Sequence, residues 1–177
     1  MSQLKVNSIV PVGGVASGQA GGVIQVTHGS TSSATTIQST SFQDTGLSAS
    51  ITPQSSSNKI LVIVSQQVYF QRNNTQAHGG VQLVRTIGGS SSNIYTGSDD
   101  GPNFGVYLGS FNNDVRIGLY AHLNVVDSPN TTSAITYKMQ VRCRTTSDSG
   151  LAVAQEESTP SHITLLDSSK VDSTGTL

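Results

Sequence analysis

The sequence has 177 residues, of which 34% are hydrophobic and 11% are charged, and its formal net charge is −1. This length fits one compact domain with short appendages. The near-zero charge excludes the strongly basic surface typical of proteins that bind nucleic acid or anionic lipid. The single cysteine, Cys143, excludes an intramolecular disulfide framework, so we expect stability to come from packing and from association between chains.

The first 22 residues consist of a short apolar patch followed by a glycine-rich run. Glycine-rich runs form flexible linkers, so we expect residues 1–12 to be an arm that docks onto another protein; a frayed terminus is the alternative. The segment lacks the basic start and apolar run of a signal peptide, which predicts synthesis in a cytoplasm without export by the usual route. The candidate docking side chains are Leu4, Val6, Ile9 and Val10.

Residues 23–168 contain one β-prone segment after another. The clearest is residues 114–126, where apolar side chains at odd positions alternate with mainly polar ones at even positions. Residues 137–144 alternate in the same way and place Cys143 on the apolar side, where a packed, unreactive thiol is expected. All five residues from 60 to 64 are apolar, which predicts a strand covered on both faces. Further strands are expected at residues 23–28, 35–43, 46–52, 80–87, 104–111, 151–156 and 162–166.

Turn-forming residues separate these segments at 53–58, 88–90, 99–102, 128–130 and 147–150. No helical periodicity stands out in the sequence. Eight to ten short strands with turns at this spacing predict an all-β fold, an antiparallel β-sandwich with a jelly roll as the favoured topology. The expected parts are an arm and linker at residues 1–22, a β-sandwich head domain at residues 23–168 and a polar tail at residues 169–177.

The sequence contains no recognisable motif for catalysis or cofactor binding. The glycine-rich run lacks the Gly-Lys-Ser/Thr ending of a phosphate loop, and no Gly-x-Ser-x-Gly elbow is present. The loop at residues 99–103 could offer oxygens to calcium, but an ordinary exposed turn has the same composition. We therefore predict no catalytic, cofactor or metal-binding residues and a protein that is not an enzyme. The four histidines are too widely spaced for a metal site, although one repeated by three-fold symmetry could bind a metal: His28, His78, His122 and His162.

Three aromatic residues, Tyr95, Phe104 and Tyr107, are candidates for contact with a receptor or glycan. Flat aromatic faces can pack against the C–H groups of a sugar ring, and Tyr95 and Phe104 flank the loop at residues 97–103. Packing in the core or at an interface is the alternative for all three side chains.

Five segments of the sequence carry a resemblance to known proteins: residues 4–9 with the glycine-rich spacer after them, 41–53, 55–62, 127–142 and 161–166. They resemble virion proteins of tailed bacteriophages, especially those of cyanobacterial and marine phages. The resemblance implies a β-sandwich subunit, usually a trimer, that its N-terminal arm holds on the particle as a fibre, a spike or a capsid decoration. This sequence has no long shaft between the arm and the head, which favours a short spike or a cement-like decoration over a receptor-binding tail fibre.

The leading hypothesis is a structural protein on the surface of a phage particle, made in the host cytoplasm. It would be a homotrimeric short fibre, spike or decoration whose arm docks onto another virion protein in the capsid, neck or baseplate. One alternative is a carbohydrate-binding adhesin that contacts host surface glycan through the loops at residues 88–104 and 127–133. Another is a depolymerase, which would need two carboxylates flanking a groove. No cofactor, nucleic acid or membrane is expected as a partner.

Overall fold

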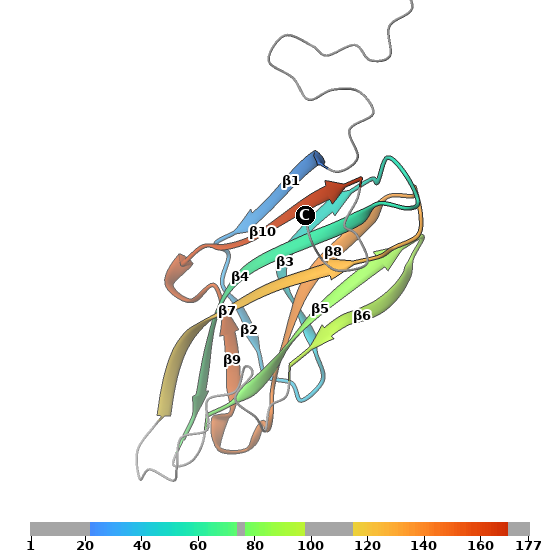
Figure 1. Cartoon of the computed structure of the whole chain (residues 1–177). Helices are drawn as coiled ribbons and strands as arrows, with labels where there is room; N and C mark the ends of the chain where they lie inside the picture. Colours follow the sequence, from blue (N-terminus) through green and yellow to red (C-terminus); the bar gives the residue numbers. More distant parts are fainter. Residues whose placement is uncertain (1–21, 74–76, 98–114, 170–177) are drawn as a thin grey trace, which may run out of the picture.

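The computed structural model describes residues 22–73, 77–97 and 115–169 (Figure 1). The expected arm, the expected strand at residues 104–111, the loop at residues 99–103 and all but the first residue of the tail lie outside the described part. Within it, the chain forms ten β-strands and two short 3-10 helices, η1 (Ser147–Ser149) and η2 (Glu156–Ser158). The strands are β1 (Val23–Thr31), β2 (Thr35–Ile37), β3 (Gln43–Ile51), β4 (Lys59–Arg72), β5 (Gly79–Ile87), β6 (Ser90–Thr96), β7 (Val115–Asp127), β8 (Ile135–Cys143), β9 (Leu151–Ala154) and β10 (Ser161–Ser168).

The first sheet is four strands wide along its whole length. Strand β4 pairs with β7 on one side, and on its other side it pairs first with β10 and then with β9. Strands β1 and β2 pair with β10 and β9 in the same order, so β1 and β2 together form one edge track, and β9 and β10 form the track beside it. Figure 1 shows β1, β10, β4 and β7 side by side in one half of this sheet and β2 and β9 in the other half.

The second sheet has the order β3-β8-β5-β6, and every pairing in both sheets is antiparallel. If β1 with β2 counts as one track and β9 with β10 as another, the two sheets contain eight tracks, which we number in chain order. Side by side, tracks 1, 8, 3 and 6 form the first sheet, and tracks 2, 7, 4 and 5 form the second. This is the connectivity of a jelly roll, in which two Greek keys close a double-layered sandwich. The all-β, antiparallel sandwich predicted from the sequence is therefore confirmed.

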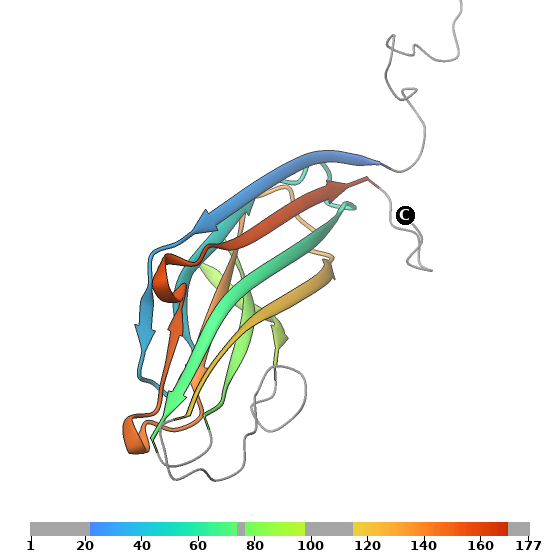
Figure 2. The same cartoon turned by 90° about the vertical axis from the view of Figure 1, so that its left-hand side faces the viewer.

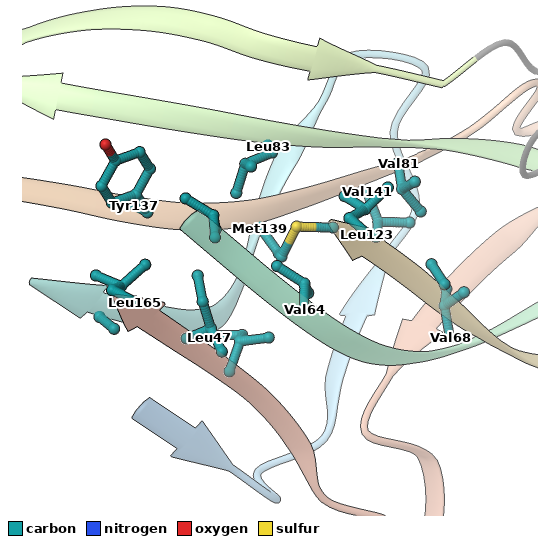
Figure 3. Packing of buried hydrophobic residues seen from close by; sticks show 14 of the residues in the cluster. Leu47, Val64, Val68, Val81, Leu83, Leu123, Tyr137, Met139, Val141 and Leu165 are labelled. Atoms are coloured by element: carbon teal, nitrogen blue, oxygen red, sulfur yellow. The ribbon is translucent and has the colours of Figure 1, made fainter. Parts of the chain in front are cut away.

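The core lies between the two sheets and follows from the two-residue alternation of their strands. In β8, buried and partly exposed residues alternate along all nine positions, with Tyr137, Met139, Val141 and Cys143 inside. Figure 3 shows Met139 of β8 beside Val64 of β4, which comes from the opposite sheet. The inward side of β7 also matches the prediction, since Ala121 and Leu123 are buried and their even-numbered neighbours are exposed.

Two glycine positions adapt the second sheet to its turns. Gly46 has a φ of +83° and lies where the register of β3 shifts against β8, a local irregularity that glycine adopts at little cost. Gly88 and Gly89 have φ values of +55° and +84° and form the two-residue turn between β5 and β6, the conformation that a tight hairpin requires.

The structure corrects two strand predictions and adds one strand that was not predicted. Residues 35–43 do not form one strand, because the chain leaves the first sheet after β2, turns through Ser39 and Ser41 and enters the second sheet as β3. Residues 90–96 form β6, although their run of serines gave no apolar alternation. The strand at residues 60–64 is covered on one face only, since Ile63 is exposed on the outer side of the first sheet.

Candidate interaction surfaces

One end of the sandwich holds both ends of the described chain. The backbone N–H of Ser169 donates to the carbonyl of Gly22 at 3.3 Å, and Figure 2 shows the start of β1 beside the end of β10. The turn after β3 is fixed at the same end by Asp167, whose carboxylate accepts from the Gln54 backbone N–H at 3.1 Å and from Asn58 Nδ2 at 2.8 Å. We call this the terminal end, because residues 1–21 and 170–177 are joined to the head there.

The opposite end, which we call the distal end, is closed by contacts between β4 and η1. Arg72 forms a salt bridge with Asp148 at 3.1 Å, and the backbone N–H of Asn73 donates to the carbonyl of Asp148 at 2.8 Å. The connection between β6 and β7 is joined to the sandwich here, since Gly97 hydrogen-bonds to Val81 near the start of β5 and β7 begins opposite Arg72. The head therefore has two distinct ends, one with the ends of the described chain, Gly22 and Ser169, and one where the connection between β6 and β7 is attached.

A buried ionic group joins the two sheets near the terminal end. Asp127, the last residue of β7, accepts two contacts from Arg85 Nη1 on β5, one at each carboxylate oxygen, at 2.9 and 3.0 Å. It also accepts a hydrogen bond of 2.7 Å from the hydroxyl of Tyr137 on β8. Burial, followed by the hydrogen bond to Asp127, raises the pKa of Tyr137 well above its usual value. The group is fully partnered, which fits a structural link between the sheets rather than a reactive site.

A second polar cluster fills a gap in the first sheet. The edge track is interrupted there at residues 32–34, between β1 and β2, and the track beside it is interrupted at residues 155–160, between β9 and β10. Thr45 Oγ1 donates to Gln66 Oε1 at 2.9 Å, and Gln66 Nε2 donates to Ser161 Oγ at 3.1 Å. The amide of Gln155 completes the cluster by donating to the Thr45 carbonyl at 2.9 Å and accepting from Gln66 at 2.6 Å. These side chains satisfy one another inside the sandwich, and two of them also bond to the β4 backbone at the gap. Ser161 Oγ accepts from the Gln67 backbone N–H at 2.9 Å, and Gln66 Nε2 donates to the Gln67 carbonyl at 2.7 Å. These two bonds take the place of ladder hydrogen bonds that the interruption removes.

The outer face of the second sheet is polar, and its side chains are linked by hydrogen bonds across the strands. Asp44 accepts from Gln140 at 2.6 Å and from Lys138 at 2.9 Å, and Gln82 donates to Gln140 at 3.0 Å. Burial acts to raise the pKa of Asp44, but the hydrogen bonds from Lys138 and Gln140 outweigh it and leave the pKa below its usual value. The polar side chains of this face therefore satisfy one another.

A shallow polar hollow of about 690 Å³ lies at the edge of this face, between residues 35–39 and the start of β3. Its lining includes Phe42, Asp44, Lys138 and Gln140. The guanidinium of Arg142 lies over the Phe42 ring, 4.8 Å from its centroid, so one side of this ring is already occupied. Sequence reasoning missed the hollow because Asp44 and Lys138 are 94 positions apart in the chain.

The structure places only some of the residues singled out from the sequence. Tyr95 is half-buried on β6 and packs against the core, and burial raises the pKa of its hydroxyl. Cys143 is buried as expected, its thiol lies 3.1 Å from the Ser39 carbonyl, and burial raises its pKa. Phe104, Tyr107 and the four docking side chains of the arm lie outside the described residues, so their roles stay predictions.

Within residues 22–73, 77–97 and 115–169, no three histidine, cysteine, aspartate or glutamate side chains gather closely enough to hold a metal ion. No helix in the same ranges is long and apolar enough to cross a membrane.

No family model and no curated protein matches the chain. Among solved structures, it is similar to a chain of the T13 viral particle of infectious bursal disease virus, at 13% identity and a TM-score of 0.38, over 81% of this chain and 37% of that one. It is also similar to the VP2 subviral particle of that virus, at 14% identity and a TM-score of 0.37, over 82% of this chain and 40% of that one. The chain thus spans well under half the length of these neighbours, and its fold is assigned from its own strand pairing.

Proposed function

We propose that the chain is a structural protein on the surface of a virus particle, a short trimeric fibre, spike or capsid decoration of a tailed phage. The segments that resemble phage virion proteins support this assignment, and the jelly roll is the β-sandwich subunit that the resemblance implies. The role proposed for the protein is mechanical and adhesive.

The observation that carries the proposal is that the head domain has two different ends. Gly22 and Ser169 lie together at the terminal end, whereas the long connection between β6 and β7 is joined to the distal end. A head held on a particle by residues 1–12 would therefore point its distal end outward. Burial of Leu4, Val6, Ile9 and Val10 in a groove of the partner would supply about 1.5–3 kcal/mol for each fully covered side chain, and an extended arm could also add a strand to the edge of the partner's sheet.

Deletion of residues 2–12 tests the role of the arm. The shortened chain should keep the far-ultraviolet spectrum of a β-sandwich and remain soluble, but it should be missing from purified particles of the phage that encodes it. A matched control exchanges Ala16 for Ser in the linker and should be incorporated normally. Incorporation of the shortened chain at the level of the full chain would refute the docking arm.

A second candidate function is binding of host surface glycan, which the polar hollow beside β3 favours. Carboxylate, amide and ammonium groups of Asp44, Gln140 and Lys138 line it together, and sugar hydroxyls bind such groups. A glycan array with the full chain and with Asp44→Ala would test it. Signals that Asp44→Ala abolishes would support a glycan site in the hollow, and signals unchanged by the substitution would exclude the hollow as their source.

A further inference from the structure

All six large hydrophobic side chains that are exposed in the described residues belong to strands of the first sheet. They are Val23, Ile24, Val26, Ile63, Tyr120 and Val126, from β1, β4 and β7. The outer face of the second sheet contributes none of them in the described part and instead carries the hydrogen-bonded polar side chains around Asp44. Scattered exposed hydrophobics are normal, but a concentration on one face is typical of an interaction site.

The strand register places three of these side chains, Val26, Ile63 and Val126, in rows across the outer face of β1, β10, β4 and β7. One row is entirely apolar and runs Val26, Leu166, Leu61, Val126. The two end members of this row are 57% and 54% exposed. The next row contains Ile63, which is 40% exposed, between polar neighbours. The second and third rows are His28, Thr164, Ile63, Asn124 and Ser30, His162, Ser65, His122.

No side chain in these three rows carries a carboxylate, an ammonium or a guanidinium group. The nearest charged neighbour at the terminal end, Lys59, is turned to Ser128 by a hydrogen bond of 2.7 Å. The rings of His28 and His162 stack at a centroid distance of 5.5 Å, and those of Tyr120 and His122 stack at 5.8 Å. Water can be removed from such a face without burying an unpaired charge.

The residues of β4 indicate that another protein surface covers this face. All five side chains from Ile60 to Val64 are apolar, the pattern of a strand buried on both sides, yet the single chain buries only Ile60, Val62 and Val64. The outward pair, Leu61 and Ile63, is the centre of the two rows described above. The sequence of β4 is therefore that of a strand with protein on both faces, whereas one copy of the chain covers only its inner face.

A second copy of the same chain fits the outer face of the first sheet in size and its three rows in charge. The first sheet is four strands wide along β4, so that about 4.8 Å per strand and about 3.3 Å per residue give its whole outer face roughly 850 Å². The seven residues of β4 from Lys59 to Ser65, which lie beside β10, account for about half of this area. Stable protein interfaces bury about 800 Å² on each partner. Because the three rows are uncharged, bringing copies together creates no repulsion between like charges.

We propose that the outer face of the first sheet, centred on the rows of β1, β10, β4 and β7, is the surface through which copies of this chain associate. The inference rests on the proposed function, because it names the face that the subunits of the oligomeric head would share. In that oligomer the apolar face lies inside and the polar outer face of the second sheet remains in contact with solvent.

Sedimentation velocity of the full chain at increasing concentration tests the proposal. The native chain should sediment as a multiple of its 18.4 kDa mass at tens of micromolar, where mass action favours association. The double variant Val26→Lys with Val126→Lys should shift to a monomer while keeping the circular dichroism spectrum, because both side chains are exposed in the single chain. A native chain that stays monomeric throughout, or a double variant that associates like the native chain, overturns the proposal.

The chain offers a matched control on the other sheet. Ser50, Thr136, Thr86 and Ser91 form a row across the outer face of the second sheet, so Ser50→Lys with Ser91→Lys adds the same charges at the two ends of an equivalent row. This control should associate like the native chain, and its dissociation would contradict a specific role for the first sheet.

A measurement on the unsubstituted chain covers the case in which the lysine variant fails to fold. Hydroxyl-radical labelling of Tyr120 should fall by several fold when the chain is concentrated, whereas labelling of Phe42, which directly precedes β3 of the second sheet, should stay constant. Equal labelling of Tyr120 at both concentrations overturns the proposal. The two proposals fail separately, since a chain that associates through this face but is absent from particles contradicts only the virion role. A particle-bound chain with no self-association contradicts only this inference.

Discussion

Replacing Tyr137 by Phe should destabilise the head domain by about 1.5–3 kcal/mol, the range for loss of a hydrogen bond to a charged group. The substitution removes only the hydroxyl that donates to Asp127 at 2.7 Å and leaves the buried ring in place, so it creates no sizeable cavity. Asp127 keeps its contacts with Arg85. The more severe change, Asp127→Ala, leaves both Arg85 and the Tyr137 hydroxyl without their carboxylate and should cost about 3–5 kcal/mol.

Urea unfolding followed by circular dichroism would measure both changes at one fixed chain concentration, because association also stabilises the folded state. For a domain of this size, each kcal/mol corresponds to a shift of about 2–4 °C in the midpoint of thermal unfolding. Ser50→Ala is a suitable control, since it removes an exposed hydrogen bond to Thr136 and should change stability by no more than about 0.5 kcal/mol. If Tyr137→Phe is as mild as this control, the ionic group does not hold the two sheets together.

Three further predictions concern single positions. Gly79→Ala should severely destabilise the chain, because the new Cβ would lie 2.1 Å from a backbone carbonyl oxygen of β8. Gly118→Ala places its Cβ where no atom lies within 4 Å, so it should stabilise the chain by about 0.4–1 kcal/mol, and thermal melts of both variants would show the difference. Cys143 should react with a thiol reagent at pH 8 only after urea unfolds the chain, and rapid reaction in buffer would contradict its burial. Asp44→Asn should cost less than about 1 kcal/mol at pH 7, because the contact with Lys138 is largely exposed. Folding lowers the pKa of Asp44, so its contribution to stability is present above the pKa that Asp44 has in the unfolded chain. The contribution disappears as the pH falls through the pKa that Asp44 has in the folded chain, so the native chain and Asp44→Asn should have the same stability in acid.

The sequence predicted the fold wherever one strand face is apolar and the other polar. Strands β7 and β8 follow this pattern, and their inward residues were identified correctly. Strand β6 was missed because Ser90 to Asn93 offer no apolar alternation, and its pairing with β5 depends on backbone hydrogen bonds that any residue can make. The break after Ile37 was missed because the chain crosses between sheets there, and β-prone polar residues on both sides conceal the crossing.

The interaction surfaces depend on contacts between residues far apart in the chain. The hollow beside β3 and the row from Val26 to Val126 each combine strands that no local pattern connects. One local signal did exist for the apolar face, since Leu61 and Ile63 lie in an unbroken apolar run. The prediction that this strand is covered on both faces is wrong for one copy of the chain, and the uncovered face is the one that we propose for self-association.

An averaged cryo-electron microscopy map of the phage particle that encodes the chain would test the virion role most directly. The account predicts symmetric jelly-roll density on the particle surface, with Gly22 and Ser169 directed toward the particle and the distal end toward solvent. Particles without such density, or heads attached by the distal end with their chain termini outward, would contradict it.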